Sequence, residues 1–240
     1  MAKATPMRGT LTGRELPMKP QVSIVIPTLN EVQGIVALVE RLGSCFPGAE
    51  IIIADGGSGD GTAEAVEQLA KIVFSENGRA CQMNAGARVA SGDILWFLHA
   101  DCWPTGRSLD LIREALENPS VVGGGFRWGL SGSKWYYGIC THLAHIKNKL
   151  RRNLFGDMGI FVRREIFERL DGYAEIPICE EIEFNKRLKK TGETVILDEV
   201  LLSSDRKLLR EGPIRAFIKN DIIKCAFALG VSPETLTRYY

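Results

Sequence analysis

The stretch VSIVIPTLNE, residues 22–31, decides the fold class of this 240-residue chain. Residues 22–26 are mostly β-branched and end at Pro27, a pattern typical of a short buried strand. Apolar side chains then recur at helical spacing from Glu31 to Leu42, which predicts an amphipathic helix. A buried strand that leads directly into a helix is the first unit of an α/β fold.

The alternation of strands and helices continues as far as residue 99. Further strands are predicted at 50–54, 71–74 and 93–99, and helices at 62–70 and 79–90. This order predicts a mostly parallel sheet with helices on both faces. After residue 104 the alternation becomes irregular, with strands predicted at 121–128, 158–163 and 194–197 and helices at 109–117, 133–150, 180–190, 213–229 and 233–240.

Length and composition favour one α/β domain without a nucleic-acid partner. The 30 Lys and Arg residues balance 29 Asp and Glu residues, so the chain has no global basic excess. We expect residues 1–20 to form a flexible tail and residues 21–240 to form the domain. No apolar run reaches the length of a signal peptide or a membrane span. The six cysteines include no C-x-x-C pair, which indicates reduced thiols and a cytoplasmic protein.

Polar clusters fall where the predicted strands end, at 27–31, 55–62 and 99–101. Ligands of parallel α/β sheets bind at the carboxyl ends of the strands. Asp55 ends a buried strand, and its carboxylate can accept hydrogen bonds from a sugar hydroxyl or a base N–H. The glycines that follow allow a ligand to approach the backbone, although a plain tight turn is the alternative. For Asp60 and Thr62, capping of the next helix is an equally good interpretation.

The tripeptide His99-Ala100-Asp101 follows the fourth predicted strand. Because side chains alternate along an extended chain, His99 and Asp101 are expected to point to the same side. A carboxylate with a neighbouring acceptor suits Mg²⁺ or Mn²⁺ bridging a diphosphate, and an imidazole suits Mn²⁺ better. The alternative is that Asp101 caps a turn and that His99 is a buried, hydrogen-bonded histidine.

Two further charged positions have both a ligand interpretation and a structural one. Arg79 opens a predicted helix that continues with Gln82 and Asn84, and a guanidinium there can hold a phosphate or stack on a base. Glu180 and Glu181 begin another helix, where acidic residues favour the helix dipole. One of these carboxylates is also a candidate general base, which a sugar-hydroxyl nucleophile needs.

Six segments together resemble glycosyltransferase family 2, in that family's order. They are VSIVIPTLNE (22–31), IIIADGGSGDGT (51–62), GRACQMNAG (78–86), GDILWFLHAD (92–101), GDMGIFVRR (156–164) and EEIEFNKRL (180–188). The chain looks most similar to a bacterial subgroup, the mycofactocin-transferase-like or arsenosugar-biosynthesis glycosyltransferases. The resemblance implies one GT-A domain, with a nucleotide-binding half at about 21–103 and an acceptor-side half at about 104–240. It also implies a UDP- or GDP-sugar donor, Mn²⁺ or Mg²⁺, and an inverting displacement.

The resemblance assigns roles to individual residues. The implied donor-binding set is Pro27, Thr28, Asn30, Glu31, Asp55, Arg79, Asn84, His99, Ala100 and Asp101. Asp101, helped by His99, is the implied metal and diphosphate ligand, and Glu181, beside Glu180, is the implied catalytic base. The chain departs from the family twice, because the usual Asp-x-Asp has His99 at its first position and the usual base Asp is Glu181.

The expected acceptor is a small molecule or a lipid-linked one. Two other function classes remain open. A nucleotidyltransferase normally carries a basic glycine-rich loop after the first strand, where this chain has residues 27–31 without a cation. A catalytically inactive, nucleotide-binding relative is motivated by His99. The helix at 213–229 is a candidate for peripheral contact with an acidic membrane, or else packs on the core. The loop at 203–207, including Arg206, is expected to close over the diphosphate.

Overall fold

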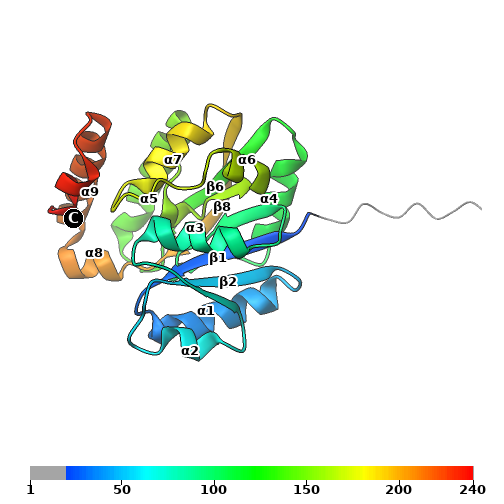
Figure 1. Cartoon of the computed structure of the whole chain (residues 1–240). Coiled ribbons are helices and arrows are strands. Elements are labelled where there is room, and N and C mark those ends of the chain that lie inside the picture. Colours follow the sequence, from blue (N-terminus) through cyan, green and yellow to red (C-terminus); the bar gives the residue numbers. More distant parts are fainter. Residues whose placement is uncertain (1–19, 240) are drawn as a thin grey trace, which may run out of the picture.

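The predicted first strand lies inside the observed sheet, between two parallel neighbours. A computed structural model describes residues 20–239, so most of the predicted tail and Tyr240 lie outside the described residues. Within that range the strands form one sheet in the order β3-β2-β1-β4-β7-β6-β8-β5 (Figure 1). The strands are β1 (Val22–Thr28), β2 (Glu50–Asp55), β3 (Lys71–Phe74), β4 (Ile94–Phe97), β5 (Cys102–Trp103), β6 (Val121–Leu130), β7 (Phe161–Arg163) and β8 (Glu193–Ser203).

Helices connect most of these strands, and every predicted helix is present. The observed helices are α1 (Val32–Cys45), α2 (Thr62–Val66), α3 (Arg79–Val89), α4 (Ser108–Glu117), α5 (Trp135–Arg151), α6 (Arg164–Arg169), α7 (Glu180–Leu188), α8 (Arg206–Glu211), α9 (Pro213–Ala228) and α10 (Pro233–Thr237), with a 3₁₀ turn η1 (Gly156–Met158). The strand β5, the helix α6 and the turn η1 were not predicted. The predicted loop at 203–207 is instead the end of β8 and the start of α8.

Strand pairing confirms the parallel first half and adds antiparallel strands in the second. The β3-β2-β1-β4 set is parallel throughout, as is the β6–β8 pair. β7 pairs antiparallel with both β4 and β6, and β5 pairs antiparallel with β8. The glycines of β6 explain its tight fit, because a Cβ at Gly124 would overlap the carbonyl oxygen of Val195.

Apolar cores cover both faces of the sheet, as the alternation predicted. On one face, Ile24 and Ile26 of β1 pack in a cluster with Leu38 of α1 and Ile112 of α4. On the other face, Val25 packs in a cluster with residues of α3, α6 and α7. Burial on both faces explains why the strand reads as a continuous apolar run rather than an alternating one.

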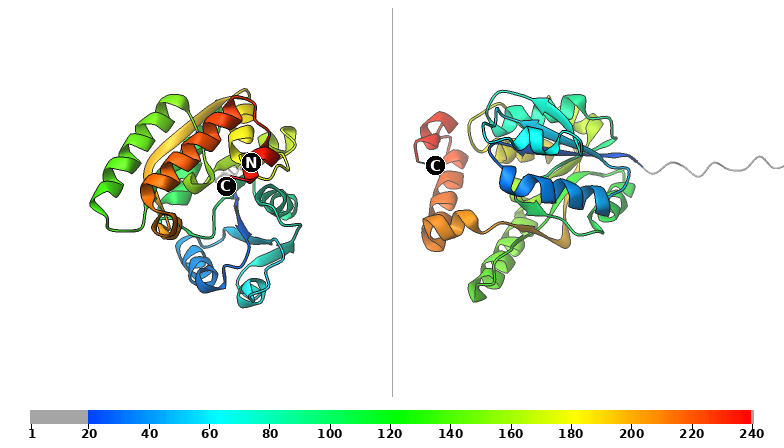
Figure 2. Two further views of the ribbon diagram at one scale, coloured as in Figure 1. Left: turned by 90° about the vertical axis from the view of Figure 1, so that its left-hand side faces the viewer. Right: turned by 90° about the horizontal axis from the view of Figure 1, so that it is seen from below.

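The carboxyl ends of the central strands meet at one edge of the sheet. The register pairs Thr28 with Asp55 and Val25 with Phe97, so β1, β2 and β4 end close together. They run toward the side on which α8 and α9 lie (Figure 1), and the left panel of Figure 2 faces this edge. The C-terminal helices therefore lie beside the edge where the polar clusters were predicted to gather.

The contact between α3 and β1 gives a test of the packing. Gly86 is buried, and a Cβ added there would overlap Cγ1 of Val25. We expect Gly86→Ala to lower the free energy of unfolding in urea by about 1–3 kcal/mol, because the close-packed interface must separate. Gly43→Ala in α1 is the matched control, since nothing lies within 4 Å of its added Cβ. The free energy of unfolding of that variant should rise by about 0.4–1 kcal/mol. Equal changes at both positions would contradict the close packing of Gly86 against Val25.

Candidate active site

The turns that follow β1 and β2 are joined by a fully bonded carboxylate. Asp55 is buried and accepts hydrogen bonds from the backbone N–H groups of Gly57 (2.9 Å) and Ser58 (2.7 Å). It also accepts from the hydroxyls of Thr28 (3.1 Å) and Ser58 (2.6 Å). Asp55 therefore orders the glycine-rich turn, and its predicted contact with a base or ribose stays a prediction.

Reciprocal bonds hold the Asn30 turn against the same loop. The N–H of Asn30 donates to the Ser58 hydroxyl (2.9 Å), and its side-chain oxygen accepts from the N–H of Gly59 (3.0 Å). Asn30 has a positive φ of 55°, a backbone conformation that asparagine tolerates better than most residues. Asp60 accepts from the N–H groups of Val32 (3.2 Å) at the start of α1 and Thr62 (3.0 Å) at the start of α2, but the N-cap residue of α2 is Gly61 rather than the predicted Asp60 or Thr62.

Two amide side chains of α3 fix the helix to the rest of the fold. Gln82 donates to the carbonyl oxygens of Thr28 (2.6 Å) and Ala54 (3.0 Å), so it links the ends of β1 and β2. Asn84 exchanges two 2.9 Å bonds with the backbone of Tyr173. The amide of Asn84 thus binds the segment before α7, and its predicted role in donor binding is untested.

A cluster of charged side chains brings together segments far apart in the sequence. The Arg79 guanidinium at the start of α3 lies 3.4 Å from Oε1 of Glu181 and 3.6 Å from Oε1 of Glu180. Nε2 of His99, which follows β4, lies 3.3 Å from the same Glu181 oxygen. Two predicted donor residues and both predicted catalytic carboxylates therefore meet at one place.

The backbone of Gly156 allows this cluster to close. A Cβ at this position would overlap both Oε1 of Glu181 and the imidazole of His99. Gly156 belongs to η1, which is followed by β7, so the antiparallel half of the sheet supports the site. The sequence motif GDMG contains this glycine, but only the folded chain shows that the side chains of Glu181 and His99 approach it closely.

The two adjacent glutamates have opposite pKa shifts. Burial and the neighbouring Glu181 charge raise the pKa of Glu180 to about 7. Burial also acts to raise the pKa of Glu181, but the contacts with His99 and Arg79 outweigh it and lower this pKa to about 2. Near neutral pH, Glu181 is therefore ionised, while Glu180 is close to half-protonated.

A third acid, Asp157 of η1, lies close to the same charges. Burial raises the pKa of its carboxyl, the charges of Lys224 and His99 oppose that rise, and those of Glu181 and Asp101 add to it. Lys224 comes from α9, and its Nζ lies 3.9 Å above the ring of Phe155. The C-terminal helix thus contributes a cation near the cluster, which the sequence did not indicate.

The predicted metal ligands provide two protein groups rather than a complete site. Among residues 20–239, no three His, Cys, Asp or Glu side chains are arranged to hold a metal ion. Nε2 of His99 is buried and lies 3.3 Å from Oε1 of Glu181 without meeting hydrogen-bond geometry, and half-buried Asp101 receives a weak 3.9 Å contact from the Cys102 thiol. Divalent cations are often bound by one or two carboxylates plus substrate phosphates and water. These residues therefore fit a metal that arrives with a diphosphate.

The segment after β8 lies against this edge. The N–H of Ser204 donates to the carbonyl oxygen of Asp101 (3.1 Å), and Arg206 lies 3.4 Å from Oε2 of Glu31. The hydroxyl of Tyr137 in α5 donates to Asp205 (3.0 Å) and so fixes the segment after β8 to α5. Arg206 thus lies beside a predicted donor residue, and its closure over a diphosphate stays a prediction.

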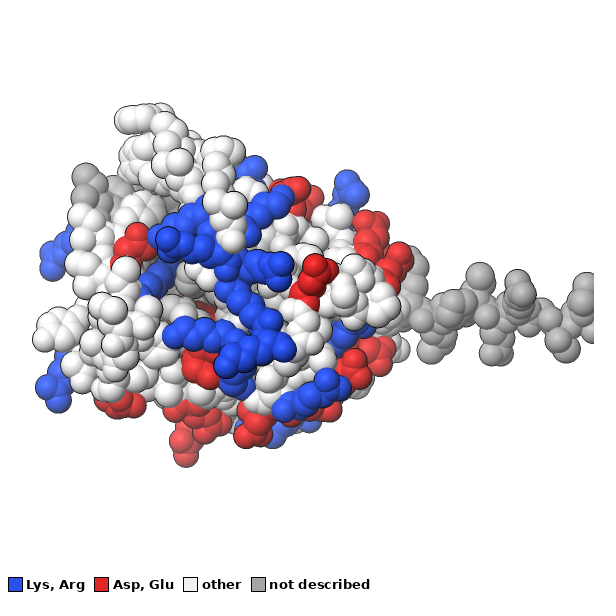
Figure 3. Space-filling view, turned by 90° about the horizontal axis from the view of Figure 1, so that it is seen from above, with Lys and Arg blue, Asp and Glu red and all other residues white. Residues whose placement is uncertain are grey.

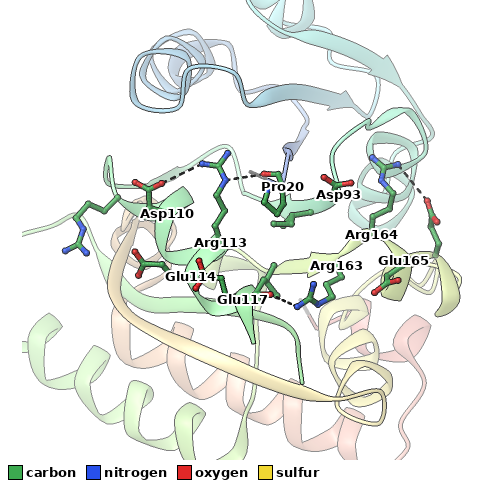
Figure 4. Close-up of a pocket in the computed structure, with 13 residues that line it drawn as sticks. Pro20, Asp93, Asp110, Arg113, Glu114, Glu117, Arg163, Arg164 and Glu165 are labelled. Carbon is green, nitrogen blue, oxygen red and sulfur yellow. Dashed lines mark hydrogen bonds and ion pairs between the residues drawn. The ribbon is translucent and has the colours of Figure 1, made fainter. Parts of the chain in front are cut away.

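A separate cavity of about 850 Å³ lies near the start of β4, away from the charged cluster (Figure 4). Three of the arginines that line it bond other parts of the fold. Arg163 donates to three backbone carbonyl groups, and Arg164 bonds the carbonyl of Gly92. Arg113 lies 3.7 Å from Asp110 and also donates to the carbonyl of Pro20. We place the active site at the carboxyl edge despite the size of this cavity, because that edge brings both candidate catalytic carboxylates together with Arg79 and His99.

The fold and this edge define an α/β protein with cations and candidate acid–base carboxylates at the carboxyl ends of its strands. Residues 23–170 match the family model Glycosyl transferase family 2. The chain belongs to glycosyltransferase family 2, and its enzyme class is glycosyltransferase. The family predicted from the six segments is therefore confirmed, and the nucleotidyltransferase alternative is set aside.

Relatives and solved structures agree with this placement. The succinoglycan biosynthesis protein ExoA of Rhizobium meliloti is 43% identical over 201 residues, covering 70% of this chain and 58% of that protein. Mannosyltransferase PcManGT from Pyrobaculum calidifontis, solved with GDP-Man and Mn²⁺, superposes with a TM-score of 0.62 at 21% identity, covering 78% of this chain and 57% of that one. Glucosyl-3-phosphoglycerate synthase from Mycobacterium tuberculosis, solved with Mn²⁺, UDP and glucosyl-3-phosphoglycerate, has a TM-score of 0.60 at 19% identity, covering 88% and 81%. These likenesses confirm the GT-A fold.

The chain is shorter than the curated relatives it matches. It spans 54%, 34% and 58% of the length of the first three. Their remaining parts have no counterpart in this match, so their activities do not transfer directly.

The raised pKa of Glu180 predicts how stability depends on pH. The native state keeps this proton up to about pH 7, whereas an unfolded carboxyl releases it near pH 4.5. Stability is therefore lost as pH rises through this window. We expect Glu180→Gln to exceed the wild type in free energy of unfolding by about 2–3 kcal/mol at pH 8, with the difference shrinking toward pH 4.5.

Glu181→Gln is the matched control in the same urea titrations. Its lowered pKa means that the native carboxylate stabilises the fold above pH 4.5 and that this contribution is lost as pH falls toward 2. This variant should be less stable than the wild type at neutral pH. If the stability of both variants changed with pH in the same way, the assignment of opposite pKa shifts to Glu180 and Glu181 would be refuted.

Proposed function

We propose that the chain is an inverting glycosyltransferase that moves a sugar from a UDP- or GDP-sugar to an acceptor hydroxyl. One observation supports this most strongly: an ionised carboxylate, Glu181, lies beside the Arg79 guanidinium at the carboxyl edge of the sheet. A group-transfer site needs a base for the incoming hydroxyl and a cation for the departing diphosphate, and both are present.

The proposed donor site is formed by the strand ends. Pro27, Thr28, Asn30 and Glu31 would line the nucleoside pocket. The Asp55-ordered loop would contact the base or ribose, and Arg79 would bind the diphosphate. The part of the chain at about 21–103 would thus bind the nucleotide, and about 104–240 would face the acceptor.

Asp101 and His99 would hold Mn²⁺ or Mg²⁺ together with the diphosphate. When bound, the cation would offset negative charge on the leaving group. The neighbours solved with Mn²⁺ and a nucleotide support this assignment. Asp101 is half-buried beside the Ser204 segment, which would shield it from bulk water once the donor is present.

Glu181 is the proposed base. It would take the proton from the acceptor hydroxyl as that oxygen bonds to the anomeric carbon. The bond from this carbon to the diphosphate oxygen then breaks, and the nucleoside diphosphate leaves from the opposite face. Binding of the diphosphate to Arg79 would weaken one of the two contacts that lower the pKa of Glu181, and would thereby increase its affinity for a proton.

Several finer features remain proposals. The acceptor is a small molecule or a lipid-linked one, and the mycofactocin-like or arsenosugar-like subgroup stays a prediction. A cytoplasmic location is supported by the six free cysteines, which a reducing compartment maintains. An inactive, nucleotide-binding relative is the second candidate, because His99 stands at a usual Asp position.

The nucleotide and metal can be identified by thermal shift. UDP, GDP, dTDP and CDP would each be tested with and without Mn²⁺. A nucleotide at ten times its dissociation constant should stabilise the protein by about 1.4 kcal/mol. Asp101→Asn should lose the Mn²⁺-dependent part of this shift, and Asp110→Asn, at the opposite cavity, should keep it. A shift without metal dependence would argue against the Asp101 role.

Donor hydrolysis tests the base without knowledge of the acceptor, since water can replace it. Glu181→Gln should lower the rate of sugar release from the preferred donor by about 10²–10⁴, with the nucleotide thermal shift retained. Glu180→Gln should keep more of the rate, because this side chain is not the proposed base. Absence of metal-dependent hydrolysis in the wild type would favour the inactive relative.

A further inference from the structure

Two neighbouring helices carry apolar side chains that face solvent. On α5 the exposed residues are Trp135, Ile139, Leu143, Ile146 and Leu150, with Trp135 82% and Leu150 81% exposed. On α9 and its last turn they are Ile218, Ile222 and Leu229. A monomeric protein rarely leaves such a contiguous apolar surface without a partner.

The α5 residues form a single stripe. They recur at intervals of three or four residues, so they share one side of the helix. The buried residues of α5, which are Tyr137, Thr141 and Asn148, lie on the opposite side. The stripe is therefore a second apolar face, separate from the one that packs on the body of the protein.

The exposed side of α9 continues this surface. The Nζ of Lys147 lies 3.6 Å from Oδ1 of Asp221, so the two helices lie side by side, as the left panel of Figure 2 shows. On α9, Ile218 and Ile222 are exposed, whereas Ala216 and Ile223 are buried. We call the exposed residues of α5 and α9 together the α5–α9 surface.

Cations surround the apolar stripe. Residues 130–156 contain five Lys or Arg residues and no Asp or Glu. By helical spacing, Lys147 and Lys149 flank the stripe on its two sides, each in an ion pair (with Asp221 and Asp198), and Arg151 lies at its end. The Nζ of Lys189 donates to the carbonyl oxygen of Arg151 (2.7 Å), which brings further basic residues next to this end. Figure 3 shows that Lys and Arg form a connected band on the adjoining face.

From this arrangement we infer that the α5–α9 surface docks on an anionic lipid bilayer. A helix with one apolar side, flanking cations and an exposed Trp is suited to the boundary between headgroups and acyl chains. None of the helices described in residues 20–239 is both long and apolar enough to cross a bilayer. The surface would lie in the plane of the membrane. The basic end of the surface at Arg151 and Lys189, and the band of Lys and Arg on the adjoining face (Figure 3), favour an anionic lipid surface over a second copy of this chain, because two such basic faces would repel each other.

Docking would place the candidate active site beside the membrane. The same α9 carries Lys224 close to Asp157 and Phe155, near the charged cluster. An acceptor held in the membrane could then approach the site from the side of α9. The docking itself does not depend on the proposed sugar transfer and can be tested separately.

Flotation with vesicles tests the inference directly. The full chain should float with vesicles of phosphatidylcholine mixed with phosphatidylglycerol, bind more weakly to phosphatidylcholine alone, and dissociate as salt is added. Leu143→Glu combined with Leu150→Glu should lower partitioning at least about tenfold, since two exposed apolar groups are lost and negative charge is added. Arg151→Gln should lower partitioning to the anionic vesicles about fivefold.

Leu69→Glu is the matched control, because Leu69 is also exposed but lies before β3, outside the α5–α9 surface. It should float like the wild type. Fluorescence of Trp135 gives an independent readout: emission should shift to the blue on adding anionic vesicles, and Trp135→Phe should lose this shift. Wild-type protein that does not float, or a Leu143/Leu150 variant that floats like the wild type, would overturn the inference. So would a wild-type dimer in sedimentation velocity that dissociates in this variant.

Discussion

A buried carboxylate is stable in this protein because polar and charged partners from distant segments reach it. Removing an ionised carboxylate from water costs several kcal/mol unless partners compensate. Glu181 has two such partners, Arg79 of α3 and His99 after β4, at 3.4 and 3.3 Å. This requirement ties α3, β4 and α7 together at one edge of the sheet. Gly156 satisfies the remaining steric condition, because any side chain there would occupy the space of the cluster.

The same cluster gives two adjacent glutamates opposite pKa shifts. Glu180 and Glu181 are adjacent at the start of α7, yet one pKa is raised to about 7 and the other lowered to about 2. Both carboxylates are buried, but the close contacts with His99 and Arg79 lower the pKa of Glu181, whereas burial and the Glu181 charge raise that of Glu180. When two carboxylates share a site, the pKa of one is raised, so the pair does not hold two full negative charges at neutral pH. The arrangement leaves one carboxylate ionised where an acceptor hydroxyl would need it.

The large cavity and the candidate catalytic groups lie at opposite edges of the sheet. The cavity near the start of β4 is large, but Arg163 and Arg164 there bond backbone carbonyl groups. At the carboxyl edge, by contrast, several acids lie close to Arg79, His99 and Lys224. The C-terminal helices extend this edge outward, with one side packed on the body and the other exposed.

The sequence by itself determined the local elements of residues 22–101 and the family. Periodicity, turn residues and strand ends are short-range features, so β1 to β4, the Asp55 turn and the His99-Ala100-Asp101 tripeptide were all placed from the sequence. The two-residue strand β5, the helix α6 and the antiparallel insertion of β7 were not, because short elements carry little periodic signal and strand direction depends on long-range pairing. Only the tertiary structure decided that Arg79 meets Glu181, 102 residues later, that Asn84 binds the backbone of Tyr173, and that Lys224 lies over the ring of Phe155. Those contacts depend on how α3, α7 and α9 pack, and packing between distant helices leaves no mark in local sequence spacing.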